Sequence, residues 1–421
     1  MTKIQFARLG WVFFIGLVIL TVANPVPTWA REQITIAMIA ETRDTHLAWQ
    51  QEMIQAFEAK HPHIKIELIS TAGSGLIDKM QAMFISGAQL DIGYHDPYLV
   101  VEWAKEGVLE DLRPYIERDK GQFADWAEPF FDLYRVGDGI YALAQDIQLN
   151  GIFYNKDDYD SAGLAYPTEH WTYDDLFENA RRLVVPAPDG SVSRHGFRIP
   201  TGRNWVPTIW AFGGDMVDDW ASPTKFIGNT KEVADALQYF NDMVELGVAQ
   251  DRSRFSSVVN NEFIDRRISM ALSNTILFGH LIDTADFAWD VVSLPRGPAG
   301  YVPQINAIGW FMFSTSEHKE EAWQVLKFFT SEEALRRRVE IIGNVSPNIA
   351  VTREVWIPSY KEPEHRHLLL AGLETARSSW MISREIWDVI AQEAYAVIWG
   401  AKPVSSALEE MERLVNGMIG R

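Results

Sequence analysis

The stretch that decides the fold runs from residue 34 to residue 68 and reads ITIAMIAETRDTHLAWQQEMIQAFEAKHPHIKIEL. Residues 34–38 are typical of a buried strand. Residues 47–57 predict a helix, because large apolar side chains recur every four positions, at Trp49, Met53 and Phe57. Residues 64–68 alternate between apolar and charged side chains, as a strand with one buried face does. Strand, helix and strand in this order predict a right-handed βαβ unit, and therefore a parallel sheet covered by helices.

The same alternation continues along the chain. We expect a helix at 76–86, a strand at 90–94 and a helix at 98–106, and later strands at 289–294 and 307–313. A chain of 421 residues also exceeds the size at which one hydrophobic core usually divides. We therefore expect two α/β lobes, each with a mainly parallel sheet flanked by helices. Because the chain is expected to pass from one lobe to the other more than once, each lobe should consist of two separate stretches of sequence. Their predicted limits are 31–147 plus 301–344 for the N-terminal lobe and 148–300 plus 345–421 for the C-terminal lobe.

The first 30 residues have the features of a secretory signal peptide. Lys3 and Arg8 precede an apolar run from Trp11 to Ala23, and small residues end the segment at Ala30. The run is shorter than the roughly 20 residues that span a bilayer. The chain has no cysteine, which excludes disulfides and a lipid-modified cysteine. We therefore expect an exported, untethered protein of the periplasm.

Charge and motifs exclude several classes of function. The formal net charge of −19 disfavours binding to nucleic acid or anionic lipid. Ser316 and Lys319 fit a Ser-x-x-Lys motif, but its companion motifs are missing. Asp215 and Asp219 are a carboxylate pair that an exported glycan hydrolase could use. We expect the histidines of 61–63 and 365–367 to lie in solvated turns rather than metal sites, and the basic run 336–338 to be an exposed helix face. No cofactor is predicted.

Several stretches in fixed order carry a family resemblance. The most specific is YAL at 141–143 leading to FYNKD at 153–157, and the others include FEAKHP at 57–62, GVLEDL at 107–112 and AWQVLKFF at 322–329. In this order they resemble family 1 of the extracellular solute-binding proteins, the sugar-binding subunits of ABC importers of the maltose-binding-protein type. The resemblance implies a periplasmic-binding-protein fold of class II type, with two lobes joined by a multi-strand hinge. It also implies a carbohydrate held between the lobes and delivered to membrane permease subunits by a monomer without enzymatic activity.

Candidate ligand residues of the N-terminal lobe follow its strands at their carboxyl ends, where α/β sheets usually bind ligands. Glu41 and Arg43 follow the first strand and match the acidic and basic residues of the family's first loop. His95 and Asp96 follow the third strand, and His95 matches an aromatic position that contacts sugar in the family. At the hinge the resemblance favours Gln148, with a buried hydrogen bond as the structural alternative. Trp310, on a strand close to the hinge, is a weaker candidate.

The C-terminal lobe supplies the remaining candidates. Asn204 and Trp205 precede the Phe212–Gly214 segment at the spacing of a family ligand loop, and Asn274 follows the strand at 269–272. Trp387 matches a stacking aromatic of the family, with helix packing as the alternative. Indole faces and amide groups suit sugar rings and hydroxyls. Arg43 together with Arg203 leaves a glycerol phosphodiester or another polyol-like solute as the alternative ligand, and a metal or a peptide in the same fold also stays open.

Overall fold

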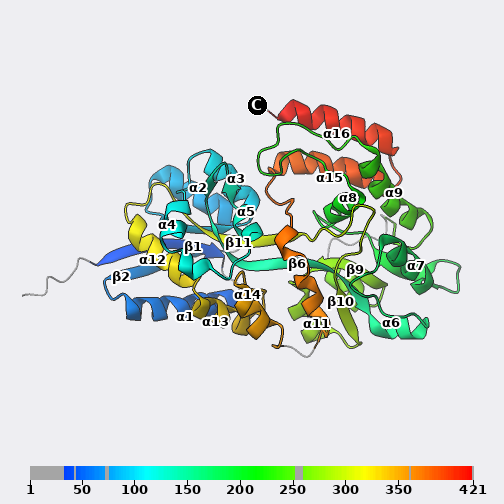
Figure 1. The fold of residues 1–421 in the computed structure, drawn as a ribbon, viewed down its shortest axis with the longest axis horizontal. Coiled ribbons are helices and arrows are strands. Elements are labelled where there is room, and N and C mark those ends of the chain that lie inside the picture. The colour runs from blue at the N-terminus through cyan, green and yellow to red at the C-terminus, as the bar shows by residue number, and fades with distance from the viewer. Residues whose placement is uncertain (1–32, 42–43, 72–74, 252–258, 360–361, 420–421) are drawn as a thin grey trace, which may run out of the picture.

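The computed structural model describes residues 33–41, 44–71, 75–251, 259–359 and 362–419 (Figure 1). The predicted signal peptide and Arg43 lie outside these residues, and the side chain of Glu41 is not among the described ones. No helix in the described ranges has both the length and the apolar character that crossing a membrane would require.

The N-terminal part of the sheet forms as the opening stretch predicts. Strand β1 (Ile34–Glu41) pairs in parallel with β2 (Ile64–Thr71), and helix α1 (Asp44–Lys60) connects them. The three apolar residues of α1 are buried, namely Trp49, Met53 and Phe57. On its other edge β1 pairs in parallel with β3 (Ile92–His95). The βαβ prediction is therefore confirmed.

The other elements divide between two lobes, which Figure 1 shows at the left and right of the view. The remaining elements before the hinge strand are α2 (Leu76–Ser86), α3 (Pro97–Lys105), α4 (Arg113–Arg118), the 3₁₀ segment Lys120–Phe123, α5 (Glu128–Asp132), β4 (Arg135–Val136) and β5 (Gly139–Ile140). The hinge strand β6 (Leu143–Asn155) is followed by α6 (Lys156–Ser161), α7 (Tyr173–Leu183), β7 (Val185–Pro186), β8 (Val192–Arg198), α8 (Val206–Phe212), α9 (Lys231–Glu245), α10 (Val259–Ile264), β9 (Ile268–Asn274), α11 (Leu277–Thr284) and β10 (Trp289–Val292). The chain then continues through β11 (Ile305–Met312), α12 (Lys319–Phe329), α13 (Glu332–Ile342), α14 (Ile349–Val351), the short helical segments Thr352–Trp356, Arg366–Leu370 and Leu373–Thr375, α15 (Arg384–Ile398) and α16 (Val404–Met418).

Strand β6 runs through both lobes (Figure 1). Its residues 143–149 pair antiparallel with β11, which in turn pairs with β3, whereas residues 150–155 pair with β9 and β10. Two further segments lie beside these strands, through isolated bridges from Ile147 to Val345 and from Gln304 to Arg377. The predicted multi-strand hinge is therefore confirmed.

Two hydrophobic cores correspond to the two lobes. One fills the N-terminal lobe and continues past the hinge to Phe278 and Trp356, and the other surrounds Trp205, Trp210 and Phe240 in the C-terminal lobe. The α/β two-lobed fold is confirmed, and the residue limits of the lobes stay a prediction.

The basic run on α13 is only partly the exposed face that the sequence predicts. Arg336 and Arg337 lie at the surface in ion pairs with glutamates. Arg338 is 2% exposed, forms a 2.6 Å ion pair with Asp146, and lies over the ring of Trp49 at 4.7 Å. The expectation was wrong for Arg338, because the helical period turns this one residue of the run toward the sheet.

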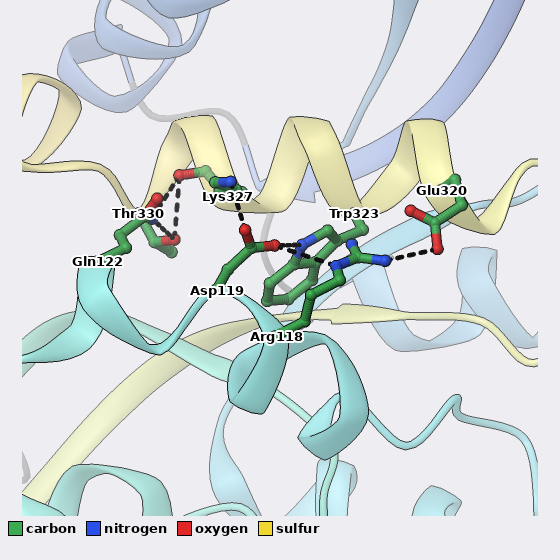
Figure 2. A network of polar contacts seen from close by, with 7 residues as sticks. All are labelled: Arg118, Asp119, Gln122, Glu320, Trp323, Lys327 and Thr330. Carbon is green, nitrogen blue, oxygen red and sulfur yellow. Dashed lines mark hydrogen bonds and ion pairs between the residues drawn. The ribbon is translucent and has the colours of Figure 1, made fainter.

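Figure 2 shows a polar network that fastens the segment after α4 to α12. The carboxylate of Asp119 accepts hydrogen bonds of 2.7 Å from the indole N–H of Trp323 and from Nζ of Lys327, and Nε of Arg118 lies 3.4 Å away. Beside it, Gln122 donates to the carbonyl of Lys327 at 2.7 Å. Burial acts to raise the pKa of Asp119, but the hydrogen bonds from Lys327 and Trp323 outweigh it, and the net pKa is lowered.

The change Asp119→Ala is expected to lower the free energy of unfolding by about 1–3 kcal/mol, because it leaves the buried indole N–H of Trp323 without its acceptor. Since the folded-state pKa lies below the ordinary 3.8, this contribution is present at neutral pH and is lost as the pH falls through the folded-state value. Urea unfolding at neutral and acid pH measures it. Glu117→Ala, at an exposed position two residues earlier, is the control and should change stability by less than about 0.5 kcal/mol.

Candidate functional site

A line of polar side chains crosses the hinge from one lobe to the other. Asn306 of β11 donates to Oδ1 of Asp96 and to Oε1 of Gln148, at 3.4 Å in each case. Asn274, at the end of β9, donates to the same oxygen of Gln148 at 3.3 Å. Asp96 belongs to the N-terminal lobe and Asn274 to the C-terminal lobe, so the two predicted residues are joined through the hinge strands.

A second group of amides extends this line into the C-terminal lobe. Asn150, two residues after Gln148, donates to Oδ1 of Asn204 at 3.0 Å and lies 3.4 Å from Oε1 of Gln304. Gln304 in turn donates to the hydroxyl of Ser379 at 2.9 Å. Antiparallel pairing places alternate residues of β6 and β11 on one face, which is why these amides meet. Together the two groups place several amide donors and acceptors side by side at the hinge.

Arg203 and three tryptophans form a stack beside these amides. The rings of Trp205 and Trp387 lie 5.4 Å apart and 26° from parallel. The guanidinium of Arg203 lies 4.5 Å from the ring of Trp387 and 5.3 Å from that of Trp380. Its hydrogen bonds go to the backbone carbonyls of Ser379 and Ile382 rather than to a carboxylate.

Charges of opposite sign face each other from the two lobes. Burial lowers the pKa of Arg203 to about 10, while the charges of Asp96 and Asp388 act to raise it. Burial raises the pKa of Tyr98, and the negative charge of Asp96 raises it further. The hinge region therefore combines a buried guanidinium, a carboxylate and a phenol with neutral amides. This set can both donate to and accept from the hydroxyl groups of a polar solute.

Residues 40–335 match the family model of the bacterial extracellular solute-binding proteins. The chain belongs to this family. A binding protein of Brucella abortus (strain 2308) is 23% identical over 290 residues, which cover 67% of this chain and 68% of that protein. Sequence and fold thus agree on a substrate-binding transport protein.

Solved structures share the fold of this solute-binding protein. An ABC substrate-binding protein of Listeria monocytogenes, in complex with cycloalternan, has a TM-score of 0.78 and 22% identity, covering 92% of this chain and 100% of that one. The cyclic α-maltosyl-1,6-maltose binding protein of Arthrobacter globiformis has a TM-score of 0.77 and 20% identity, covering 92% and 99%.

Most of the predicted site residues of the solute-binding protein fall into two groups. Asp96, Gln148, Asn204 and Asn274 lie in the hydrogen-bonded lines described above, and His95 lies beside Asp96 with its Nδ1 accepting from the Asp96 backbone N–H at 2.8 Å. Trp205 and Trp387 are 0% and 8% exposed and stack on each other, so packing accounts for both. The solvent-exposed indole faces that a sugar would need are not offered by this pair.

Trp310 is a core residue in this structure. It is 0% exposed, and its ring lies 5.1 Å from that of Tyr94 and 5.7 Å from that of Phe329. Register explains the burial, because Trp310 pairs with Tyr94 of β3 in the middle of the sheet. A fully buried Trp310 has no surface with which to contact a ligand, so the prediction of ligand contact was wrong for this residue.

Sequence reasoning missed Asn150 and Asn306, although a signal for them exists. In β6 the polar residues Asp146, Gln148 and Asn150 alternate with apolar Ile147 and Leu149 in a strand that is buried throughout. Period-two polar residues inside an otherwise buried strand indicate a polar surface that the strand faces. The same rule applied to Gln304 and Asn306 would have predicted the polar residues that the neighbouring chain segment adds to this face.

The residues suggestive of enzymatic chemistry have other partners in the solute-binding protein. Oδ1 of Asp215 accepts from the indole N–H groups of Trp210 and Trp220, and Arg377 pairs with the same carboxylate. Ser316 donates to Asp91 at 2.5 Å, while Nζ of Lys319 pairs with Glu110 at 2.6 Å. Ser316 and Lys319 thus bond to different carboxylates, and the carboxylate of Asp215 is occupied by two indoles and an arginine.

Within the part of the chain that the structure describes, ligand atoms of Asp290, Glu364 and His365 lie within 4.8 Å of one another, close enough to hold a metal ion. However, the buried carboxylate of Asp290 already accepts from Nδ1 of His365 at 2.6 Å and from the backbone N–H groups of Val291 and His365. These hydrogen bonds attach β10 to the 362–370 segment, which gives the cluster a structural role.

The sequence analysis predicted a solvated turn at 365–367. That prediction is wrong in part, because Arg366, between the two histidines, is 2% exposed.

Proposed function

We propose that the protein captures a neutral carbohydrate, a mono- or oligosaccharide, between its lobes. The observation that carries this proposal is the hydrogen-bonded line from Asp96 through Asn306 and Gln148 to Asn274, which presents amides and a carboxylate from both lobes at the hinge. Such groups pair with hydroxyls as both donors and acceptors. The carbohydrate ligands named for the structural neighbours support the same class of solute.

The surroundings of Arg203 favour a neutral polyol over a glycerol phosphodiester. A phosphate group would gain charge-assisted hydrogen bonds from this arginine. It would also meet the carboxylates of Asp96 and Asp388, whose charges act on Arg203, in a chain of net charge −19. A hydroxyl group can accept from the guanidinium and donate to Asp96 at the same time. A glycerol phosphodiester is the alternative ligand, and the binding test described below includes it.

The proposed cellular role is delivery of the solute to the permease of an ABC transporter. A signal peptide at 1–30 would export the chain to the periplasm, and the protein would act there as a monomer without turning over its ligand. The engagement of Asp215 and Ser316 in other contacts supports a binding role rather than catalysis. Lobe closure around the ligand would be the state that the permease recognises.

Thermal unfolding in the presence of sugars tests the proposal. At one hundred times its Kd, a ligand that binds only the folded state adds about 2.7 kcal/mol, which raises the Tm of a domain pair of this size by about 3 °C. The panel contains mono- and oligosaccharides, sugar alcohols and glycerophosphodiesters. We expect at least one neutral carbohydrate to raise the Tm.

The variant Asp96→Ala should lose that shift, and Glu106→Ala, on the exposed end of the following helix, should keep it. A shift with glycerophosphodiesters and none with neutral carbohydrates would overturn the proposed ligand class. Each stabilising sugar is also incubated with the protein and analysed by chromatography. The appearance of a new product would overturn the non-catalytic role.

A further inference from the structure

Among the tryptophans in the described part of the chain, two are only partly buried, and one of these adjoins the proposed site. Trp380 and Trp399 keep part of their surface exposed, whereas the other described tryptophans are buried. Trp399 stacks on Tyr395 near the end of α15, with the two rings 12° from parallel. Trp380 lies before α15 and directly follows Ser379, whose hydroxyl accepts from Gln304 of the hinge amides. Trp380 is therefore the partly exposed indole that adjoins the polar line.

Trp380 is the outer member of a stack of flat groups. The rings of Trp205 and Trp387 lie 5.4 Å apart, and the guanidinium of Arg203 lies 4.5 Å from the ring of Trp387. The same guanidinium lies 5.3 Å from the centre of the Trp380 ring. The first three members are at most 8% exposed, and of the four only Trp380 has a larger part of its surface open to solvent. Trp380 is thus the member of the stack that a solute can contact.

The backbone around Trp380 is held on both sides of the indole. The N–H of Trp380 donates to the hydroxyl of Ser378 at 3.2 Å. Arg203 donates to the carbonyls of Ser379 and Ile382. Ser378, Ser379 and Ile382 are at most 6% exposed. Because these contacts fix the segment before a ligand arrives, binding at the indole immobilises few additional groups of the protein.

We propose that the exposed surface of Trp380 is the platform on which one ring of the ligand stacks, and that the ligand is therefore a cyclic sugar rather than an open-chain polyol. The inference rests on the proposed function, because it assigns the apolar contact of the same site. A face of a pyranose ring carries C–H groups that pack against an indole, while the hydroxyls at its rim reach hydrogen-bonding groups. An open-chain alditol has no such rigid face and loses more torsional freedom on binding.

Calorimetry with cyclic and open-chain probes tests this proposal. The cyclic probes are glucose, galactose, maltose and trehalose, and the open-chain probes are sorbitol and galactitol. We expect the tightest ligand to be cyclic, and Trp380→Leu should weaken its binding about 10-fold, because the flat indole face is lost. Trp380→Phe keeps a smaller aromatic face and should weaken binding by less than about 3-fold. The control Trp399→Leu removes the other partly exposed indole of the described chain and should leave the Kd within about 2-fold.

Fluorine NMR separates direct stacking from a purely structural role of Trp380. In protein labelled with fluorotryptophan, Trp380→Phe identifies the resonance of this indole by its absence. The tightest cyclic sugar should shift that resonance and leave the resonance of Trp399 in place. Weaker binding in Trp380→Leu without such a shift would mean that Trp380 only supports Arg203, and would overturn the platform.

Two further outcomes separate failure of the platform from failure of the proposed function. An unchanged Kd in Trp380→Leu, or tighter binding of sorbitol or galactitol than of every cyclic probe, would overturn the platform although a solute binds. Failure of every carbohydrate in the thermal panel to bind would instead overturn the proposed ligand class, and this inference with it.

Discussion

Replacing Arg338 by Leu is expected to lower the free energy of unfolding by about 3–5 kcal/mol. Arg338 and Asp146 form an ion pair of 2.6 Å, and their side chains are only 2% and 4% exposed. Removing the guanidinium would leave a buried carboxylate supported by Asn344, which donates to the same Oδ2 at 2.8 Å. A buried Asp146 carboxylate without its guanidinium partner destabilises the fold by far more than the remaining hydrogen bond from Asn344 stabilises it.

Two further variants separate this cost from general damage to α13. Arg337→Leu removes the preceding arginine, which is 43% exposed and pairs with Glu52, and should cost less than about 1 kcal/mol. The double change Arg338→Leu with Asp146→Leu should be more stable than Arg338→Leu alone, because no charge is left buried. Urea unfolding followed by tryptophan fluorescence measures all three. A loss of 1 kcal/mol or less in Arg338→Leu would contradict the prediction.

Local sequence signals were sufficient for the βαβ unit and for the helices and strands predicted at 76–106, 289–294 and 307–313. The period of four at Trp49, Met53 and Phe57 places α1, and all three side chains are buried as that period predicts. This signal works because a helix face depends on residues a few positions apart. The multi-strand hinge, in contrast, was implied by the family resemblance alone.

The contacts of the site depend on pairings that no local pattern contains. Asn306 meets Gln148 because β11 runs antiparallel to β6, and 158 positions of sequence separate the two residues. Likewise, the burial of Trp387 follows from the stack with Trp205, which requires α15 to pack against the loop before α8. Sequence could name Gln148 and Trp387 as candidates, but only the register decides which of them faces polar groups and which packs.

The change Arg203→Gln is expected to weaken binding of the best carbohydrate about 10- to 100-fold, because hydrogen bonds to a charged group contribute about 1.5–3 kcal/mol. In the proposed site, Arg203 stacks on Trp387, and its charge interacts with that of Asp96 in the opposite lobe. Arg203→Lys should lose nearly as much affinity, because an ammonium keeps the charge but lacks the planar fork that stacks and donates in fixed directions. Calorimetry with the stabilising sugar gives the Kd values.

A double-mutant cycle with Asp96 distinguishes direct contact between Arg203 and the ligand from a purely structural role of this arginine. If one ligand hydroxyl accepts from Arg203 and donates to Asp96, the losses from Arg203→Gln and Asp96→Ala are not additive, and the double variant loses less than their sum by at least about 0.5 kcal/mol. Arg182→Gln, an exposed arginine of α7, serves as the charge control and should leave the Kd within 2-fold. Additive losses, accompanied by an equal fall of Tm in Arg203→Gln, would mean that this arginine only holds the 379–382 segment. Non-additive losses at an unchanged Tm would place the ligand between the two lobes at this pair of residues.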